Sequence, residues 1–331
     1  MKLFLGIDGG QTATKSILAD EFGRVLGTGR GGPAIHLKDA ATRQHARRAL
    51  FEAVHEALTR AGLSDSAAIE SAFLGFTGIS GSGTEAARTY CEVVQEQFSI
   101  GQIGIDHDAC TALAGAIPSM VGVIAIAGTG SIAFGMNALG ERARAGGWGY
   151  LLGDPGSAYE MGREAIAAVG EAHDGTGPPT SLTLLVLQAL GIDEPGLITR
   201  AVYQDPSPKL RIASVSPVVS RAAETGDAVA KSILDAGGRK LGLMAGAVAL
   251  RLRPAEPNWV FSAAGGVMQA GELIWRPYRV SLQAQFPASQ IVAPEFSPLV
   301  GALLLALKQS GVNASRRVRE QIACAMDSEG R

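Results

Sequence analysis

The sequence predicts an α/β protein made of two similarly built domains. Two glycine turns carry this prediction: Gly6-Ile7-Asp8-Gly9-Gly10 near the N-terminus, and Ala127-Gly128-Thr129-Gly130-Ser131 further along the chain. Each turn lies between two short apolar stretches, which is the pattern of a β-hairpin. The length of 331 residues suits two domains, and the apolar content of 47% is ample for two cores.

The first domain is expected to begin with three strands joined by tight turns, within residues 1–30. Helices and strands then alternate, which is typical of a sheet with both faces covered. Gly62 is the expected C-terminal stop of the first helix. The expected elements after the meander are a helix at 38–62, a strand at 72–76, a helix at 84–97, a strand at 103–105 and a helix at 109–116 opened by Asp108.

The second domain is expected to start near Val121 and to repeat the three-strand arrangement around the second glycine turn. A glycine-dense loop, Ala145 to Ser157, separates this meander from a helical region. Asp227 is a good N-cap for the longest helix. The expected elements are helices at 157–169, 181–190, 195–203, 211–224 and 227–250, a strand at 259–263, a helix after Met268, a strand at 290–293, and helices from Pro298 to Leu307 and over about 314–325.

The composition excludes several classes of protein. A net charge of −2 argues against a nucleic-acid binder, because such proteins usually carry a basic patch. Cys91, Cys110 and Cys324 lie far apart, which fits a reducing cytosol and gives no zinc or iron–sulfur spacing. The N-terminus lacks a signal-peptide pattern. The uncharged stretch 109–140 is broken by proline and glycine, so its apolar runs are too short for a bilayer. We therefore expect a cytoplasmic protein without nucleic-acid or membrane partners.

The two glycine turns are suited to anion binding. Glycine lets backbone N–H groups approach an anion because it has no Cβ. One turn from each half of the chain could clamp a polyphosphate from two sides. The hydroxyls of Thr12, Thr14, Thr129 and Ser131 suit phosphate or magnesium-bound water.

Two aspartates stand at the ends of predicted strands. Asp8 could anchor Mg²⁺ through water, because this ion takes one or two carboxylates together with waters and phosphates; alternatively it caps a turn. Asp108 could be a general base that accepts a proton from a substrate hydroxyl, or the N-cap of the helix that follows. The residues alone leave both alternatives open. His107 and Cys110 are expected to have structural roles.

The loop from Gly146 to Ser157 is the other strong signal. Such glycine density is unfavourable unless the backbone must approach something closely. Asp154 is the only carboxylate in the loop, and sugar hydroxyls suit backbone amides together with a carboxylate; the alternative is a tight structural crossing. Gly265-Gly266 after a strand could let an adenine lie over bare backbone. The chain has no Walker A motif and no GxGxxG after its first strand, which disfavours P-loop enzymes and dinucleotide dehydrogenases.

On these residues the chain resembles the N-acetylglucosamine kinase branch of the sugar kinase, Hsp70 and actin superfamily, which is grouped with the benzoyl-CoA reductase ATPases. Gly6 to Lys15 looks like the first phosphate motif, and Ala127 to Ser131 looks like the second. Ala264 to Val267 resembles the adenosine motif. The segment from Gly146 to Ser157 is similar to the family pattern GGWGxxxGDEGS and is the most specific piece. Pro298 to Ala306 resembles the helix that returns to the first domain.

The resemblance implies two actin-like (ribonuclease H-like) α/β domains with a cleft between them. The N-terminal domain would comprise residues 1–113 plus 299–331, and the C-terminal domain residues 114–298. The implied activity is transfer of the γ-phosphoryl group of ATP, with Mg²⁺, to a hydroxyl of an amino sugar such as N-acetylglucosamine or glucosamine, with O6 as the expected acceptor. The partners would be the sugar and ATP, and a homodimer is expected because such kinases commonly dimerise.

The resemblance also assigns roles to residues. Asp108 would be the catalytic base and contact the sugar, and Asp8 would place Mg²⁺ through water. The sugar-binding residues would be Gly146, Gly147, Asp154, Ile35 and His36. The residues that bind ATP and its phosphates would be Gly9, Gly10, Gln11, Thr12, Lys15, Gly128, Thr129, Gly130, Ser131, Gly265 and Gly266.

Two positions depart from the family pattern. Relatives usually place an Asn in the loop after the first meander, but here Ile35 occupies or adjoins that place, with His36 as a substitute donor. Pro155 stands where relatives have a Glu after the loop aspartate. The first change removes a polar contact to sugar, and the second removes a carboxylate.

Two other functions remain open on the same fold. One is an activator ATPase of the kind that serves CoA-ester reductases and dehydratases. Those proteins hold an iron–sulfur cluster with cysteines, and the positions of Cys91, Cys110 and Cys324 suit this poorly. The other is a non-catalytic sensor of sugar or nucleotide, against which the presence of Asp8 and Asp108 argues.

Overall fold

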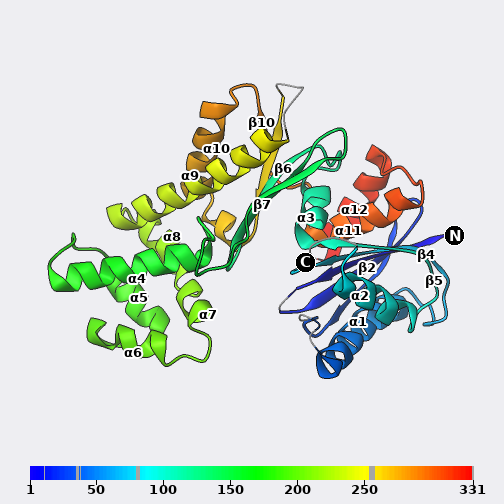
Figure 1. The fold of residues 1–331 in the computed structure, drawn as a ribbon, viewed down its shortest axis with the longest axis horizontal. Coiled ribbons are helices and arrows are strands. Elements are labelled where there is room, and N and C mark those ends of the chain that lie inside the picture. Colours follow the sequence, from blue (N-terminus) through cyan, green and yellow to red (C-terminus); the bar gives the residue numbers. More distant parts are fainter. Residues whose placement is uncertain (11, 35–36, 38, 80–82, 253–257, 330–331) are drawn as a thin grey trace. The chain divides into compact units, whose positions relative to one another are not determined.

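The computed structural model describes residues 1–329 except 11, 35–36, 38, 80–82 and 253–257. The chain divides into two compact units, Met1–Met120 with Pro294–Arg331 and Val121–Ala293 (Figure 1). These limits differ by a few residues from the sequence-based domain boundaries at 113/114 and 298/299. The difference arises because the whole of α3 (Asp108–Ala116) packs against α11 (Pro298–Gln309) in the first unit.

The sheet of the first unit combines an antiparallel meander with two parallel strands. Its order is β3-β2-β1-β4-β5, where β2 is antiparallel to both β1 and β3, and β4 runs parallel to β1 and β5. Alternate residues of β1 point to opposite faces, so Leu5 and Ile7 join one core and Phe4 joins another. The strands are β1 (Leu3–Gly9), β2 (Thr14–Asp20), β3 (Val25–Gly31), β4 (Ile69–Phe76) and β5 (Ile100–His107).

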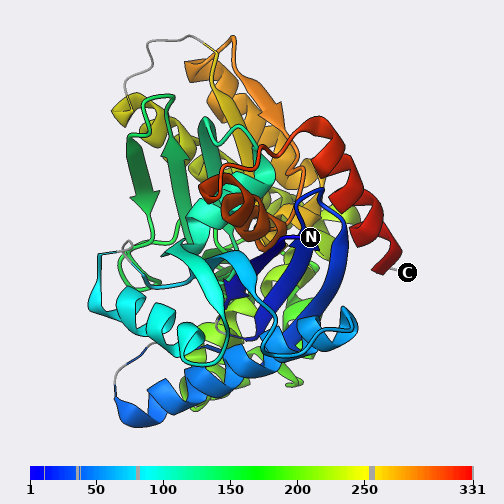
Figure 2. The ribbon, with the colours of Figure 1, turned by 90° about the vertical axis from the view of Figure 1, so that its right-hand side faces the viewer.

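Helices cover both faces of this sheet. The face of Leu5 packs against α1 and α2, and the face of Phe4 packs against α11 and α12. Figure 2 shows α1, in blue, lying along the blue strands. It lies this close because Gly27 and Gly29 of β3 meet backbone carbonyls of α1 where a side chain would otherwise stand. The remaining helices of this unit are α1 (Ala40–Arg60), α2 (Glu85–Gln95) and α12 (Arg316–Glu329).

The sheet of the second unit repeats the first. Its order is β10-β9-β6-β7-β8, with β6, β7 and β8 forming an antiparallel meander and β9 and β10 running parallel to β6. The prediction of two similarly built α/β domains is therefore confirmed. The strands are β6 (Gly122–Ala127), β7 (Ser131–Met136), β8 (Arg142–Gly146), β9 (Val260–Ala264) and β10 (Gln290–Val292).

A long helix organises the second unit. Helix α9 packs on the meander and against α10 and α8. The predicted cap is confirmed, because Asp227 Oδ1 accepts a hydrogen bond of 2.9 Å from the Ala230 N–H. The helices are α4 (Ala158–Asp174), α5 (Leu182–Leu190), η1 (Pro195–Leu197), α6 (Ile198–Tyr203), α7 (Pro208–Ala213), α8 (Ser216–Glu224), α9 (Ala228–Arg251), η2 (Gly266–Ala270) and α10 (Glu272–Gln285).

One predicted helix, 211–224, is wrong. The chain instead forms α7 and α8, with a break at Ser214 and Val215. Pro217 lies in the first turn of α8. A proline has no N–H and clashes with the carbonyl four residues earlier, so a helix cannot continue through it without distortion.

The predicted strands 72–76 and 103–105 are longer in the structure. β4 begins at Ile69 and β5 begins at Ile100. The added residues include polar ones such as Glu70 and Gln102, which hid the apolar pattern. Among the described residues no single helix is long and apolar enough to cross a membrane, although the bent pair Leu182–Leu190 and Pro195–Tyr203 together reach the length and composition required.

Candidate active site

The register of the first sheet brings three aspartates to one edge. Asp8 on β1 lies beside Gly75 on β4, and Gly75 lies beside Asp106 on β5. Asp108 follows two residues later as the first residue of α3. Ligands of α/β sheets commonly bind at the carboxyl ends of parallel strands. This edge therefore holds the acidic groups of the candidate site.

Two neighbours hold the Asp108 carboxylate. Thr77 Oγ1 donates a hydrogen bond of 2.6 Å to Asp108 Oδ2, and His107 Nδ1 lies 2.7 Å from Oδ1. The His107 nitrogen also lies 3.0 Å from the Ala109 nitrogen, so the ring tautomer decides which of the two bonds forms. His107 occupies the N-cap position of α3, so the alternative that Asp108 is the N-cap is wrong.

These contacts set the protonation of Asp108. Burial raises its pKa, but the hydrogen bond and charge of His107, with hydrogen bonds from Thr77 and the Ala109 N–H, outweigh burial and lower the pKa overall. The side chain is 30% exposed. An ionised carboxylate that still reaches the surface can orient a substrate hydroxyl and accept its proton.

Asp8 has the opposite electrostatic environment. Burial, followed by the charge of Asp108, raises its pKa to about 6, while Lys15 acts in the other direction. Asp8 and Asp108 are close together, and Lys15 only partly offsets their negative charge. Such a pair is a suitable environment for a divalent cation. The described residues contain no cluster of three or more His, Cys, Asp or Glu side chains that could hold a metal. This donor set fits Mg²⁺, which takes few carboxylates and completes its shell with water and phosphate.

The first glycine turn joins β1 to β2. The Gly10 N–H donates to the Ala13 carbonyl (3.1 Å), and Lys15 lies opposite Asp8 in the ladder. Gly9 is required by packing, because a side chain there would overlap the Phe76 ring. Thr12 is exposed at the turn. Gln11, Ile35 and His36 lie outside the described residues.

Two of the hydroxyls predicted to suit phosphate are buried. Thr14 is fully buried, so its hydroxyl is not exposed at the turn. Ser131 is 4% exposed, and its hydroxyl donates to the Pro155 carbonyl (2.8 Å). This bond links the second turn to the loop that contains Asp154. The Ser131 hydroxyl already donates its hydrogen bond to the protein backbone.

The second glycine turn keeps an open side and a packed side. Apart from its chain neighbours, no described residue comes within 4 Å of the place where a Cβ of residue 128 would lie. A Cβ at position 130 would lie 2.7 Å from Asp154 Oδ2. Helix α4 also starts on this turn, since the Ala158 N–H donates to the Gly128 carbonyl (2.8 Å) and the Tyr159 N–H donates to the Thr129 carbonyl (3.3 Å). The turn and the Asp154 loop form one packed structure.

Gly146 and Gly147, at the start of the loop before α4, are also required by the backbone conformation. Gly146 and Gly147 have left-handed φ angles of +75° and +69°. The Gly147 N–H donates to the Ser131 carbonyl (2.9 Å), which extends the β7–β8 pairing. Asp154 is only 3% exposed, and its φ of +59° is rare for a residue with a side chain. The loop therefore holds Asp154 in an unusual backbone conformation beside the second turn.

The proposed adenosine motif lies next to the same turn. Gly265 has a φ of +104° and contacts the Ala127 carbonyl, while Gly266 is open. Strand β9, which leads into this motif, pairs with β6, which leads into the second turn. A separate cavity of about 450 Å³ in the second unit is lined by other residues, including Leu197, Arg200 and Asp205.

Three residues near the candidate site were not predicted from the sequence. Thr77 bonds to Asp108, Glu160 bonds to Gly156 in the Asp154 loop, and Lys240 bonds to Glu160. Thr77 follows β4 directly, and its position at the carboxyl end of a strand was the available signal. Glu160 stands three residues after the N-cap Ser157, which is the spacing of a capping box. Lys240, on α9, had no signal in the sequence.

The sequence and the fold are similar to those of known sugar kinases. The chain is 32% identical over 307 residues to an N-acetylmuramic acid/N-acetylglucosamine kinase of Clostridium acetobutylicum, covering 92% of this chain and 98% of that protein. A structure of a candidate N-acetylglucosamine kinase from Chromobacterium violaceum is 27% identical with a TM-score of 0.71, covering 92% of this chain and 99% of the other.

A more distant structure supports the fold alone. A ROK family glucokinase of Streptomyces griseus, solved with glucose and AMPPNP, has a TM-score of 0.58 at 20% identity, covering 92% of this chain and 99% of that one. The architecture is thus the actin-like ATPase fold of sugar kinases. Residues 5–306 match the model of the BadF/BadG/BcrA/BcrD ATPase family, and the chain belongs to this family.

Proposed function

We propose that this chain is an ATP-dependent kinase that phosphorylates a hydroxyl group of an amino sugar, with N-acetylglucosamine as the first candidate. The names of the related proteins support the amino sugar, and membership of the ATPase family supports the use of ATP. The structural observation that carries the proposal is the Asp108 carboxylate, which Thr77 and His107 contact and which lies close to Asp8. The same contacts lower its pKa.

Asp108 is the proposed base. The sugar oxygen forms a bond to the γ-phosphorus while the bond from that phosphorus to the β–γ bridging oxygen breaks. The hydroxyl proton passes to an Asp108 carboxylate oxygen, and ADP leaves. Asp8 would hold Mg²⁺ through water, and the ion would neutralise charge on the phosphates.

Residues of both glycine turns, with Lys15, would bind the rest of the nucleotide. The N–H groups of Gly10 and Gly128 bond within their own turns, so these two glycines would give the phosphates room. The proposed donors to the phosphates are Thr12 of the first turn, the Lys15 side chain on β2, and Thr129 and Gly130 of the second turn. The open face of Gly266 is the proposed site for adenosine. These assignments rest on the exposed backbone and on the family motifs.

Asp154, Gly146 and Gly147 are the proposed sugar contacts. O6 is the proposed acceptor. Because Pro155 cannot supply the carboxylate of the usual Glu, we expect the sugar specificity of this chain to differ from that of relatives with the GDEGS pattern. A cytoplasmic location and a homodimer stay predictions of the sequence.

The cysteines favour a kinase over an activator ATPase. Cys91 lies on α2, Cys324 is exposed on α12, and Cys110 is buried in α3. Cluster-binding thiolates need to converge on one site, and three cysteines on three helices, one of them in a core, do not offer such a set.

A product assay tests the proposal directly. Purified protein would be incubated with ATP, Mg²⁺ and N-acetylglucosamine, N-acetylmuramic acid, glucosamine or glucose, and ADP and sugar phosphate would be measured. We expect phosphorylation of at least one amino sugar, and Asp108→Asn should lower kcat/KM by about 10²–10⁴-fold. No sugar phosphate from any acceptor would overturn the function, and full activity of Asp108→Asn would overturn the assigned base.

A further inference from the structure

We propose that Glu160 and Lys240 are positioning residues that hold the Asp154 loop in its sugar-binding conformation. This inference rests on the proposed function, because it deepens the role of the sugar-binding loop. Neither residue would touch the substrate. Both would act through the backbone of Gly156.

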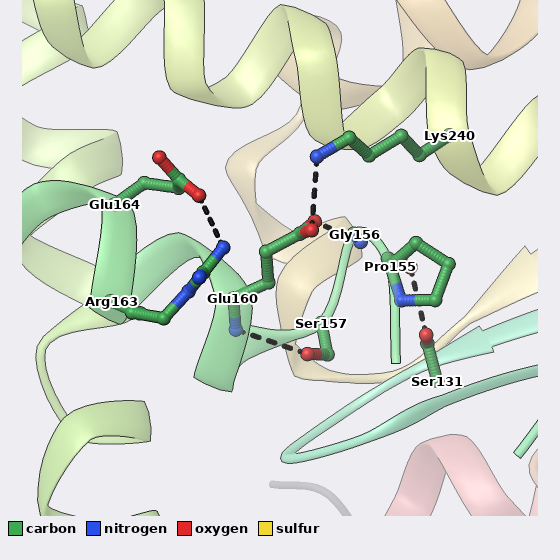
Figure 3. Close-up of polar contacts among 8 residues, drawn as sticks. All are labelled: Ser131, Pro155, Gly156, Ser157, Glu160, Arg163, Glu164 and Lys240. Atoms are coloured by element: carbon green, nitrogen blue, oxygen red, sulfur yellow. Dashed lines mark hydrogen bonds and ion pairs between the residues drawn. The ribbon is translucent and has the colours of Figure 1, made fainter. Parts of the chain in front are cut away.

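Glu160 bonds to the loop and to α9 at once. Its Oε2 accepts a hydrogen bond of 2.6 Å from the Gly156 N–H, and its Oε1 accepts one of 2.9 Å from Lys240 Nζ. Figure 3 shows the carboxylate between the loop backbone and the lysine. The Glu160 side chain is 15% exposed. A charge-assisted bond in such a setting is stronger than one between neutral groups.

The loop needs support from outside itself. Asp154 and Gly156 both have left-handed φ angles, +59° and +74°, and Pro155 between them has no N–H to donate. A non-glycine residue in this region persists only where the surrounding structure enforces it. Three side chains provide that support: Ser131 binds the Pro155 carbonyl, Ser157 caps α4, and Glu160 binds the Gly156 N–H.

The loop is fixed relative to α9 at two places. A side chain on Gly156 would overlap the Gly237 carbonyl and Leu241, so the loop backbone lies directly on this helix. Lys240, from the same part of α9, forms the ion pair with Glu160. Sliding of the loop along α9 would break the ion pair and open the close contact together.

Simple helix capping does not account for this arrangement. Ser157 Oγ already accepts the Glu160 N–H (3.1 Å) and caps α4. In a capping box the acidic side chain bonds back to the N-cap N–H. Here Glu160 reaches one residue further, to Gly156, which lies within the loop. Its carboxylate therefore fixes the loop in addition to the helix end.

This geometry also bears on Pro155. Pro155 carries no carboxylate, and Glu160 places one on the adjacent backbone amide of Gly156. Loss of Glu160 would let the loop leave the conformation that presents Asp154. If only a fraction of the molecules hold the binding conformation, the apparent Kd equals the intrinsic Kd divided by that fraction.

The test combines kinetics with hydrogen–deuterium exchange. Four variants would be compared with the wild type: Glu160→Ala, Glu160→Gln, Lys240→Met and the control Glu164→Ala. Glu164 lies one turn along α4 and pairs with Arg163 at the surface, so its loss leaves the loop untouched. The Glu160→Gln variant keeps an acceptor for the Gly156 N–H without the ion pair, and Lys240→Met removes the ion pair without altering Glu160.

We expect Glu160→Ala to raise the KM for N-acetylglucosamine about tenfold, with kcat and the KM for ATP within about threefold of wild type. Glu160→Gln and Lys240→Met should have smaller effects of the same kind. Exchange in a peptide covering residues 153–157 should rise in the order Glu164→Ala, Lys240→Met, Glu160→Ala.

The two readouts separate this inference from the function. If the wild type phosphorylates no sugar, the proposed function fails, while the exchange measurement still tests the support of the loop. Unchanged exchange at 153–157 in Glu160→Ala would overturn the inference. So would a rise of both KM values to the same extent, since that would indicate a general loss of structure.

Discussion

Thr77 Oγ1 donates a hydrogen bond of 2.6 Å to Asp108 Oδ2, although the two residues are 31 positions apart. Thr77 follows β4, and Asp108 follows the neighbouring parallel strand β5. Because β4 and β5 pair in parallel, their carboxyl ends lie side by side. The Thr77 hydroxyl after β4 therefore meets the Asp108 carboxylate after β5. The bond helps keep Asp108 ionised.

Thr77→Val should impair catalysis more than substrate binding. The lost hydrogen bond removes one cause of the lowered pKa of Asp108, so its pKa should rise. A base must be deprotonated to act, and the acidic limb of the kcat/KM profile should therefore move to higher pH. We expect kcat to fall about tenfold. Thr89→Val, on the exposed side of α2, is the matched control; an unshifted pH profile in Thr77→Val would contradict the role of Thr77.

Asp8→Asn should weaken the affinity for magnesium. The variant removes a buried charge that Asp108 repels, so the apoprotein should unfold at the same temperature or higher. With one carboxylate fewer, the Mg²⁺ concentration for half-maximal velocity at fixed ATP should rise about tenfold. The surface variant Asp65→Asn serves as control. An unchanged Mg²⁺ titration in Asp8→Asn would show that Asp8 does not serve the metal.

Gly130→Ala should displace the Asp154 carboxylate. The new methyl group would lie 2.7 Å from Asp154 Oδ2, which is closer than such contacts allow. Because Asp154 is a proposed sugar contact, we expect kcat/KM for the sugar to fall at least about tenfold. Gly170→Ala lies inside α4, and none of the described residues outside that helix comes within 4 Å of the new methyl group, so it should keep full activity and gain about 1 kcal/mol of stability. Equal activity of the two variants would disprove the close packing of Gly130 and Asp154.

Asp227→Ala should destabilise the second unit. Asp227 caps α9 and also accepts hydrogen bonds from the Ser181 N–H and the Ser181 and Thr180 hydroxyls. Losing these bonds should lower the free energy of unfolding by about 1–3 kcal/mol at pH 7. Asp227→Asn, which keeps an acceptor, should lose less.

The pH dependence of that loss has a defined sign. Burial raises the pKa of Asp227, but its hydrogen bonds lower it overall. A carboxyl group with a depressed folded-state pKa stabilises the protein above its unfolded-state pKa, and this contribution is lost as the pH falls through the folded-state value. The difference between wild type and Asp227→Ala in denaturant unfolding should therefore shrink below about pH 4. A difference that is constant down to about pH 2 would show that the carboxylate charge does not contribute.

Local patterns were enough to predict much of this protein. The glycine hairpins after Asp8 and Ala127, the repeated meander and the N-cap at Asp227 depend on residues close together in the chain. The predicted membership of the kinase and ATPase family rests on such segments and is confirmed. The predicted helix 211–224 is wrong because Pro217 lies in the first turn of a new helix, α8.

Contacts between distant segments could not be predicted in this way. Thr14 and Ser131 looked equally available for phosphate, yet Thr14 is buried and the Ser131 hydroxyl donates a hydrogen bond to the Pro155 carbonyl. Gly9 looked like a phosphate residue, while the Phe76 ring gives it a packing reason. Side-chain type alone does not reveal which face of a sheet or loop a residue occupies.

The two glycine turns, the order of the strands along the chain and the family are all encoded in short contiguous motifs, so the sequence was sufficient to establish them. The support of Asp108 by Thr77, and the link from Gly156 through Glu160 to Lys240, became visible only in the folded chain. Those partners meet through strand register and helix packing. Both are set by the burial of apolar faces across the whole unit, so no local pattern records them.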